Sequence, residues 1–112
     1  MAIINGKPDF IARLNYLTYE EGGRSIPTSS GYRPQVKFDF SELLTGGQQM
    51  FIDKELVYPG ESVMAEILLV STDFARFKLV VGSKFEFREG ARTIGHGEII
   101  EILNPILIEK TE

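Results

Sequence analysis

Residues 84–103 read KFEFREGARTIGHGEIIEIL, and apolar side chains recur at every second position at its start (Phe85, Phe87) and near its end (Ile100, Ile102). Phe85 and Phe87 alternate with charged residues before a Glu-Gly pair, and the alternation resumes after it. A period of two is the pattern of a β-strand, and a Glu-Gly pair between two such runs is a turn signal. The stretch therefore predicts two β-strands joined by a tight turn.

The second strand of this pair divides into two faces if the alternation is strict. One face holds Ile94, His96, Glu98, Ile100 and Ile102, and the other holds Gly95, Gly97, Ile99, Glu101 and Leu103. Both faces carry Ile or Leu, which predicts that part of the strand is covered on both sides. His96 lies between two glycines, and we expect it to be a half-buried residue that fills space over them. A catalytic role for His96 would require a deep pocket around it.

The same period predicts further strands along the chain. Phe10, Ala12, Leu14 and Tyr16 share one face of a first strand, and Val36, Phe38 and Phe40 share one face of another. Residues 63–72 form the longest candidate strand. Turn signals separate the runs at Gly22-Gly23, Ser29-Ser30-Gly31, Thr45-Gly46-Gly47 and Tyr58-Pro59-Gly60, the last being typical of a type II turn. Short strands at this spacing, with no convincing helix, predict an antiparallel sandwich or barrel.

Length and composition limit the functions to consider. A chain of 112 residues predicts one domain over residues 1–112. It has no cysteine, which excludes a disulfide framework and a thiolate metal site and fits a cytoplasmic protein. The longest apolar runs fall far short of the roughly 20 residues of a membrane-spanning helix. The net charge of −4 argues mildly against strong nucleic-acid binding by the chain alone.

The common catalytic and nucleotide-binding motifs are missing. There is no phosphate-binding G-x-x-x-x-G-K-[ST] motif and no G-x-S-x-G elbow. A single histidine without cysteine excludes the common zinc sites and Cys-His catalysis. No pair of acidic residues stands out, and Glu20-Glu21 is expected at a solvated hairpin end. We therefore expect a non-enzymatic protein that uses no nucleotide, cofactor or metal.

Two Gly-Arg segments carry a resemblance to a known family. The first is EEGGR at 20–24 followed by GYRPQ at 31–35, and the second is REGARTIG at 88–95. With the turn VYPGESV at 57–63 between them, they resemble, in order, the C-terminal domain of bacterial elongation factor Tu. The resemblance covers about 9–103 and leaves 104–112 as a tail or an extra edge strand. It implies a closed six-stranded antiparallel β-barrel.

In that family the domain contacts the T-stem backbone of aminoacyl-tRNA. Carried over residue by residue, these contacts fall on Arg24, Gln35, Thr45 with Gly46, and Glu89 with Gly90. The Thr45 placement assumes a one-residue shift after Gln35. We expect Arg33 and Arg92 to brace the loops by pairing with Glu20, Glu21 or Glu89. Alternatively, the hairpins need all of these residues for structural reasons alone.

The sequence also departs from the family. The first loop has Ser25, Thr28 and Ser29 where the family usually has a histidine and two phenylalanines, so it lacks aromatic anchors. Ala91 replaces a glycine, and the GTPase domain is absent, which implies a free-standing homologue. Two functions remain open. The chain binds tRNA-like RNA or a translation-associated protein, or it is a protein-interaction or self-association module, for which the apolar tail at 106–108 argues.

Overall fold

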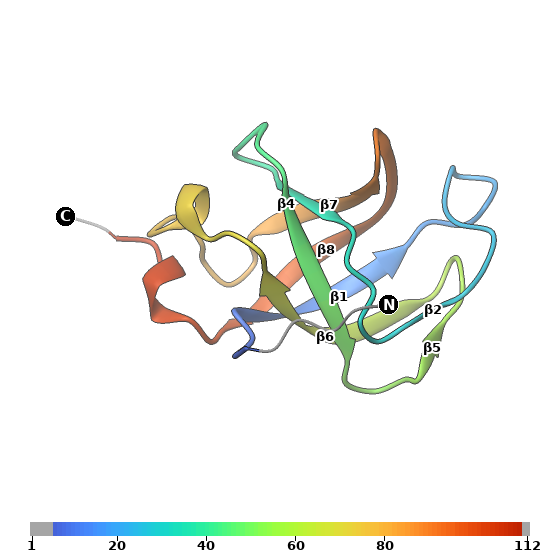
Figure 1. The fold of residues 1–112 in the computed structure, drawn as a ribbon, viewed down its shortest axis with the longest axis horizontal. Coiled ribbons are helices and arrows are strands. Elements are labelled where there is room, and N and C mark those ends of the chain that lie inside the picture. The colour runs from blue at the N-terminus through green and yellow to red at the C-terminus, as the bar shows by residue number, and fades with distance from the viewer. Residues whose placement is uncertain (1–5, 111–112) are drawn as a thin grey trace.

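The computed structural model describes residues 6–110, and its main element is a closed β-barrel (Figure 1). The strands are β1 (Phe10–Tyr16), β2 (Thr28–Ser29), β3 (Gln35–Phe38), β4 (Thr45–Phe51), β5 (Leu56–Val57), β6 (Ser62–Leu69), β7 (Lys84–Glu89) and β8 (Arg92–Ile102). Six of them follow each other around the barrel in the order β1-β6-β4-β3-β7-β8, and β8 pairs with β1. All of these pairings are antiparallel, so the expected six-stranded antiparallel barrel is confirmed. β2 and β5 form a separate two-stranded sheet.

The predicted pair of strands at 84–103 is β7 and β8, and its sequence explains its packing. Phe85 lies opposite Gly97, and Phe87 lies opposite Gly95. A Cβ atom on Gly97 would lie 2.2 Å from the Phe85 ring, and one on Gly95 would lie 2.1 Å from the Phe87 ring. The two rings therefore lie directly on the backbone of β8, which only glycine permits.

The two faces of β8 differ from the expectation. The register with β7 shifts after Phe87, and the register with β1 shifts after Ile11. Because each β-bulge adds one residue to a strand, it interrupts the strict alternation. Ile94 and Ile99 are therefore both buried, although simple alternation places them on opposite faces. His96 lies exposed on the outside, and the expectation of a half-buried histidine is wrong because phenylalanine rings already cover the neighbouring glycines.

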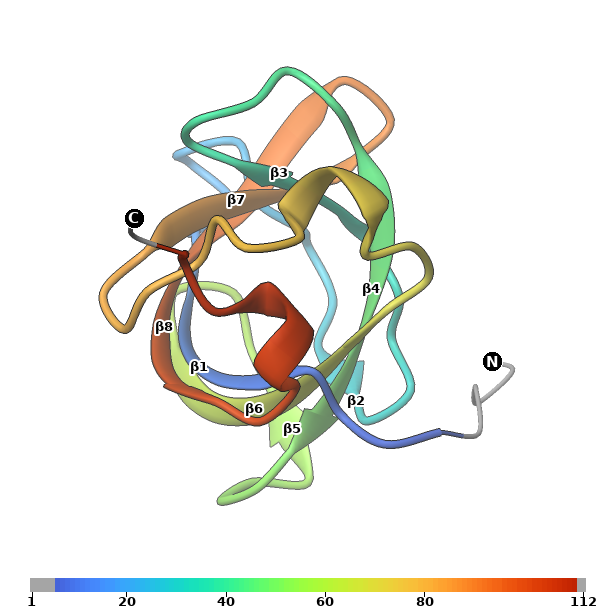
Figure 2. The ribbon, with the colours of Figure 1, turned by 90° about the vertical axis from the view of Figure 1, so that its left-hand side faces the viewer.

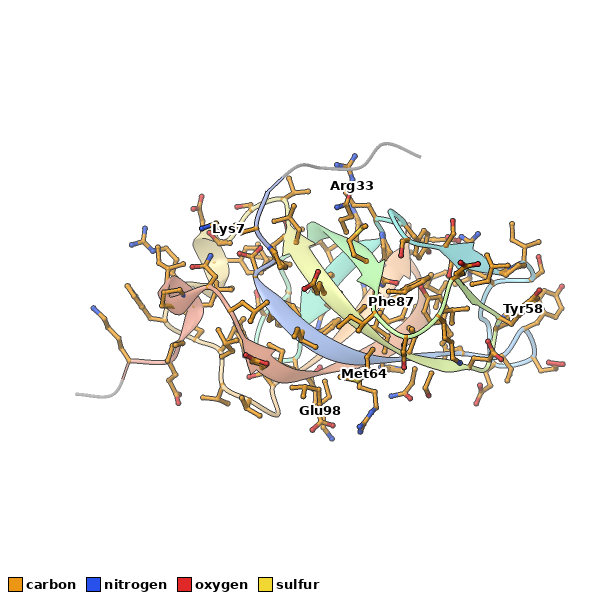
Figure 3. All side chains as sticks on the ribbon, turned by 90° about the horizontal axis from the view of Figure 1, so that it is seen from below. Lys7, Arg33, Tyr58, Met64, Phe87 and Glu98 are labelled. Atoms are coloured by element: carbon orange, nitrogen blue, oxygen red, sulfur yellow. The ribbon has the colours of Figure 1, made fainter. Side chains whose placement is uncertain are left out.

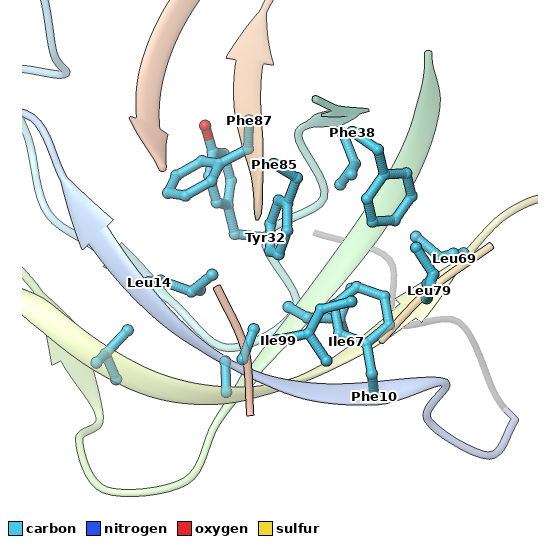
Figure 4. Close-up of a cluster of buried hydrophobic side chains, with 14 of the residues drawn as sticks. Phe10, Leu14, Tyr32, Phe38, Ile67, Leu69, Leu79, Phe85, Phe87 and Ile99 are labelled. Carbon is cyan, nitrogen blue, oxygen red and sulfur yellow. The ribbon is translucent and has the colours of Figure 1, made fainter. Parts of the chain in front are cut away.

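The barrel interior is an apolar core rich in aromatic rings (Figure 4). The inner face of β1 holds Phe10, Ala12, Leu14 and Tyr16, as predicted, and all four are buried. The Phe10 ring meets the Phe85 ring edge-on, with 5.7 Å between the centroids. Phe40 was expected on the inner face of its strand, but β3 ends at Phe38. Its ring stacks on Phe38 from a half-exposed position.

The structure corrects the interpretation of Thr45-Gly46-Gly47 as a turn. These residues begin β4, which is a largely buried strand although its sequence, TGGQQMF, is mostly polar. Gly47 is needed there because a Cβ atom would lie 2.6 Å from Cγ2 of Val36. Gln48 and Gln49 are both buried, and the Gln49 side chain accepts a hydrogen bond from the Tyr16 hydroxyl at 2.5 Å. Buried amides with partners thus replace the apolar residues that mark the other strands.

The other predicted glycine turns are confirmed, whereas the prediction of the longest strand is wrong. Gly22, Gly31 and Gly60 have φ values of 101°, 100° and 88°, as turns with positive φ require. The Glu61 amide donates to the Tyr58 carbonyl at 3.0 Å, so the type II turn is confirmed. The longest strand is β8 with 11 residues, whereas the candidate at 63–72 is β6, which ends at Leu69.

Residues beyond β8 lie across one end of the barrel. The 3₁₀ turns η1 (Asp73–Ala75) and η2 (Pro105–Leu107) both cover its mouth (Figure 2). Leu107 and Leu79 are completely buried, and the Leu79 amide donates to the Leu107 carbonyl at 2.9 Å. A single parallel bridge joins Leu79 to Ile108. The described part of the C-terminal segment therefore closes the barrel end.

Asp9 ties this segment to the barrel wall. Its Oδ2 accepts a hydrogen bond from the Leu69 amide at 2.7 Å, and its Oδ1 accepts one from Nδ2 of Asn104 at 2.8 Å. The Asp9 carbonyl also accepts from the amides of Leu103 and Asn104. The carboxylate is buried and satisfied, so it links the start of β1, the end of β6 and the C-terminal segment. Among residues 6–110, no helix is long and apolar enough to cross a membrane.

Candidate functional site

A hollow of about 450 Å³ lies where the chain entering β3 meets the turn between β7 and β8. It is lined by Tyr32, Arg33, Pro34, Gln35, Arg88, Glu89 and Gly90. Gln35 is exposed and pairs with Arg88 of β7 on one side and with Gly46 of β4 on the other. Five of the six predicted RNA-contacting residues therefore lie on three adjacent strands and the turn that follows β7, namely Gln35, Thr45, Gly46, Glu89 and Gly90.

Glu89, the last residue of β7, is the centre of a side-chain network beside the hollow. Its Oε2 accepts a hydrogen bond from the Tyr32 hydroxyl at 2.5 Å and forms an ion pair with Arg24. Its Oε1 accepts from the Arg92 guanidinium at 3.3 Å. The Arg24 guanidinium also lies over the Tyr32 ring, 4.9 Å from its centroid. Residues from three separate segments thus hold one carboxylate.

Burial and charge set the ionisation of this network. Burial alone would raise the pKa of Glu89, but the Tyr32 hydrogen bond and the Arg24 charge outweigh it, so the pKa lies below its ordinary value. Burial first, and then the Glu89 carboxylate, raise the pKa of the Tyr32 hydroxyl above its ordinary value. Around neutral pH, Glu89 is therefore an anion and Tyr32 a neutral donor.

The three arginines predicted near the site differ in their surroundings. The Arg24 side chain is only 17% exposed, and its guanidinium is engaged by Glu89 and Tyr32. Arg92 pairs with Glu89, one of the pairings expected for it. Arg33 is exposed, and within residues 6–110 it forms no ion pair with Glu20, Glu21 or Glu89. Figure 3 shows Arg33 projecting from the surface of the barrel.

The glycines and Thr45 occupy different positions relative to the hollow. A Cβ atom on Gly46 would lie 3.5 Å from Cγ of Arg33, so the stem of Arg33 passes beside Gly46. Gly90 has a φ of 61° and open space around its missing side chain. Thr45 is buried, and its hydroxyl accepts a hydrogen bond from the Ser71 amide at 3.0 Å. The Thr45 hydroxyl is therefore occupied by the backbone that follows β6.

Three lining residues were assigned no role from the sequence, namely Tyr32, Pro34 and Arg88. Arg88 forms an ion pair with Glu86 on the outer face of β7, and Glu86 also accepts from the Thr93 hydroxyl at 2.8 Å. Tyr32 is 5% exposed and belongs to the core, although its hydroxyl reaches Glu89. The signal for Tyr32 was its spacing of four from the inward-facing Val36, because a buried tyrosine needs a partner for its hydroxyl.

The arrangement offers donors and an anionic acceptor on a single open surface. Arg33 and Gln35 present side-chain donors, and the Gly90 turn presents backbone that no side chain covers. Glu89 presents an anionic acceptor next to them. In the described part of the chain there is no group of three or more His, Cys, Asp or Glu residues that could hold a metal ion.

The comparison with protein families agrees with this geometry. A family model described as the elongation factor Tu C-terminal domain matches residues 3–103. The match includes every strand from β1 to β8 and ends just before η2. It also includes both Gly-Arg segments and the hollow between them. This chain belongs to the elongation factor Tu C-terminal domain family.

Proposed function

We propose that this chain is a non-enzymatic, cytoplasmic protein that binds the backbone of a tRNA-like RNA stem and needs no cofactor. One observation carries the proposal. Gln35, Glu89 and Gly90 line one hollow together with Arg33, although they are distant in sequence. Gly46 lies beside them as the strand partner of Gln35. Membership of a translation-factor domain family supports the same reading.

The chemistry of the hollow fits an RNA backbone. Arg33 is exposed and free of carboxylate partners in the described residues, so it is suited to a phosphate. Gln35 and the backbone at Gly90 add uncharged donors. A carboxylate repels phosphate, so Glu89 would instead accept a hydrogen bond from a ribose 2′-hydroxyl, which DNA lacks.

The contacts of Arg24 and Arg33 suggest roles different from those expected from the sequence. We assign the phosphate contact to Arg33, because its guanidinium is exposed and has no carboxylate partner in residues 6–110. We assign the bracing role to Arg24, because Glu89 and the Tyr32 ring already engage it. Arg92 keeps its expected bracing role through Glu89.

The test measures binding of a fluorescently labelled RNA stem to the 112-residue chain as salt is varied. Roughly three phosphate contacts give a log–log salt slope of about −2 to −3. Arg33→Gln should weaken binding and reduce the magnitude of the slope by about 1. The matched control is Arg13→Gln, an exposed arginine on β1, which lies three strands away from β3 around the barrel.

Two results would contradict the proposal. The first is an absence of RNA binding by the unmodified chain even at low salt. The second is an equal effect of Arg33→Gln and Arg13→Gln, because this would mean that only the net charge matters.

A protein-interaction or self-association function remains the second candidate, and exposed apolar side chains favour it. Near the β2–β5 sheet, Tyr19, Ile26, Leu56 and Tyr58 are exposed, and Figure 3 shows Tyr58 at the extremity of the molecule. The tail offers less support than expected, because Leu107 is buried against the barrel. Self-association predicts a mass that rises with concentration in sedimentation, and Leu56→Ser with Tyr58→Ser should abolish the rise. A constant monomer mass would reject self-association.

A further inference from the structure

We propose that Tyr32 is a positioning residue, which holds Glu89 from within the barrel core in the orientation in which its carboxylate accepts a ribose hydroxyl. The inference rests on the RNA binding proposed above and concerns the same hollow. It adds a group that need not touch RNA and that nevertheless decides whether the site distinguishes RNA from DNA.

The position of the Tyr32 hydroxyl is fixed by its surroundings. The ring is 5% exposed and packs in the core cluster near Phe85 and Phe87 (Figure 4). The Tyr32 carbonyl accepts a hydrogen bond from the Gln49 amide at 2.8 Å, which joins this residue to β4. The Arg24 guanidinium covers one face of the ring. A tyrosine has few rotatable bonds, so a packed ring leaves its hydroxyl little freedom.

The Glu89 side chain is not fixed by packing in the core, as the Tyr32 ring is. Its side chain is 32% exposed and stands at the end of β7, immediately before the turn at Gly90. Arg92, the partner of Oε1, is itself more than half exposed and lies at 3.3 Å, so it constrains the carboxylate weakly. Oε2 instead meets the Tyr32 hydroxyl at 2.5 Å and Arg24. The buried partners thus hold Oε2, and Oε1 stays on the more exposed side.

Tyr32 and Arg24 act differently on this carboxylate. Arg24 brings a positive charge, which partly offsets the negative charge of Glu89. Tyr32 is a neutral donor, so it orients the carboxylate and leaves its charge in place. A hydrogen bond to an ionised acceptor is about twice as strong as one between neutral groups. The lowered pKa of Glu89 agrees with this arrangement. Burial acts to raise this pKa, and the Tyr32 hydrogen bond is one of the interactions that lower it.

Tyr32→Phe is the informative variant, and Tyr16→Phe is its matched control. Tyr16 is also 5% exposed, and its hydroxyl also donates to a side-chain oxygen at 2.5 Å, but the acceptor is Gln49. Both substitutions remove one buried hydroxyl and keep the ring. Only Tyr32→Phe removes a hydrogen bond from Glu89, and it leaves the ring face that Arg24 covers.

Two measurements report on the proposal. Carboxyl NMR titration should show a higher pKa of Glu89 in Tyr32→Phe than in the unmodified chain. In Tyr16→Phe the pKa of Glu89 should stay the same as in the unmodified chain. Binding is compared between an RNA stem and the same stem with 2′-deoxyribose. The unmodified chain should prefer ribose, and Tyr32→Phe should reduce that preference by about tenfold, the low end for a hydrogen bond to a charged group. The salt slope should not change, because no phosphate contact is removed.

The outcomes separate the two proposals. If the unmodified chain binds no RNA stem, both the proposed function and the role of Tyr32 in ribose recognition are rejected. If the chain binds RNA but Tyr32→Phe keeps the ribose preference, the role of Tyr32 is overturned and the proposed function stands. An unchanged pKa of Glu89 in Tyr32→Phe overturns the positioning role independently of any RNA.

A double-mutant cycle guards against a general loss of packing. Glu89→Ala removes the carboxylate, and with it the acceptor of the Tyr32 hydroxyl and of the proposed ribose contact. If Tyr32 acts through Glu89, adding Tyr32→Phe to Glu89→Ala causes no further loss of ribose preference. An additional loss of the same size as in the unmodified background would show that Tyr32 acts by another route, and would overturn the proposal.

Discussion

The two ends of this barrel differ in their chemistry. At one end, Leu107 and Leu79 are buried in an apolar contact that η1 and η2 cover. Towards the other, the Tyr16–Gln49 hydrogen bond and the network around Glu89 are polar. Apolar burial is strong but has no direction, whereas hydrogen bonds are individually weak but directional. The apolar end therefore contributes mainly stability, and the polar end contributes orientation.

The strongest way to break this contrast is to remove the apolar closure. Leu107→Ala deletes a completely buried side chain and should lower the free energy of unfolding by about 2–5 kcal/mol. Urea denaturation measures the loss. Ile108→Ala, at the neighbouring and half-exposed position, should change stability by no more than about 0.5 kcal/mol. Equal effects of the two substitutions would mean that Leu107 does not close the barrel.

The second effect in size concerns the polar anchor of the apolar end. Asp9→Ala leaves the buried Leu69 amide without its side-chain acceptor and should cost about 1–3 kcal/mol. Hydrogen exchange measures where the stability is lost, and protection should fall at Leu69 and Asn104 before it falls in β7. A uniform loss across the barrel would instead mean that Asp9 stabilises the whole fold.

A smaller effect is expected from the polar end. Tyr16→Phe leaves the Gln49 side-chain oxygen without its donor and should cost about 1 kcal/mol in urea denaturation. Tyr58→Phe removes the hydroxyl of an exposed tyrosine and should leave stability unchanged. A Tyr16→Phe cost as large as that of Leu107→Ala would erase the difference between the two ends.

The smallest effect is a dependence of stability on pH. The pKa of Glu89 is lowered in the folded chain, so its stabilising contribution is present above the ordinary carboxyl pKa, 4.5, and is lost as pH falls below it through the folded value. Glu89→Gln should therefore flatten the fall in melting temperature between neutral and acidic pH. Glu86 also has a lowered pKa, so part of the fall should persist in this variant. An identical pH profile in Glu89→Gln would contradict the ionic role of Glu89.

The parts of the fold that were predictable from sequence are those in which apolar residues alternate strictly, as on the buried face of β1 with Phe10, Leu14 and Tyr16. The packing of Phe85 and Phe87 on Gly97 and Gly95 was not predicted, because His96 was expected over these glycines. β4 was not predictable, because its buried positions hold glutamines whose partners lie elsewhere in the chain. The bulges in β8 were also not predicted, because the position of an inserted residue is defined only by the register with the partner strands.

The candidate site shows the same limit. The resemblance predicted Gln35, Gly46, Glu89 and Gly90, and the structure brings them together. Of the two arginines expected to brace the loops, Arg92 pairs with Glu89, whereas Arg24 rather than Arg33 forms the other ion pair in the described residues. That choice depends on which guanidinium reaches Glu89 across more than fifty residues of chain. The answer also involves Tyr32, whose hydroxyl and ring both take part. No local pattern contains that information.

The seam between β1 and β8 has a consequence for synthesis. Phe10 pairs with Ile102, so the first strand of the barrel needs the last one to complete its hydrogen bonding. A ribosome adds about 5–20 residues per second, so the nascent chain holds an unfinished β1 for roughly 5–20 s. During that interval the apolar face of β1 and its unpaired edge are open to other chains. The time spent in this state favours protection by a chaperone until β8 has emerged from the exit tunnel.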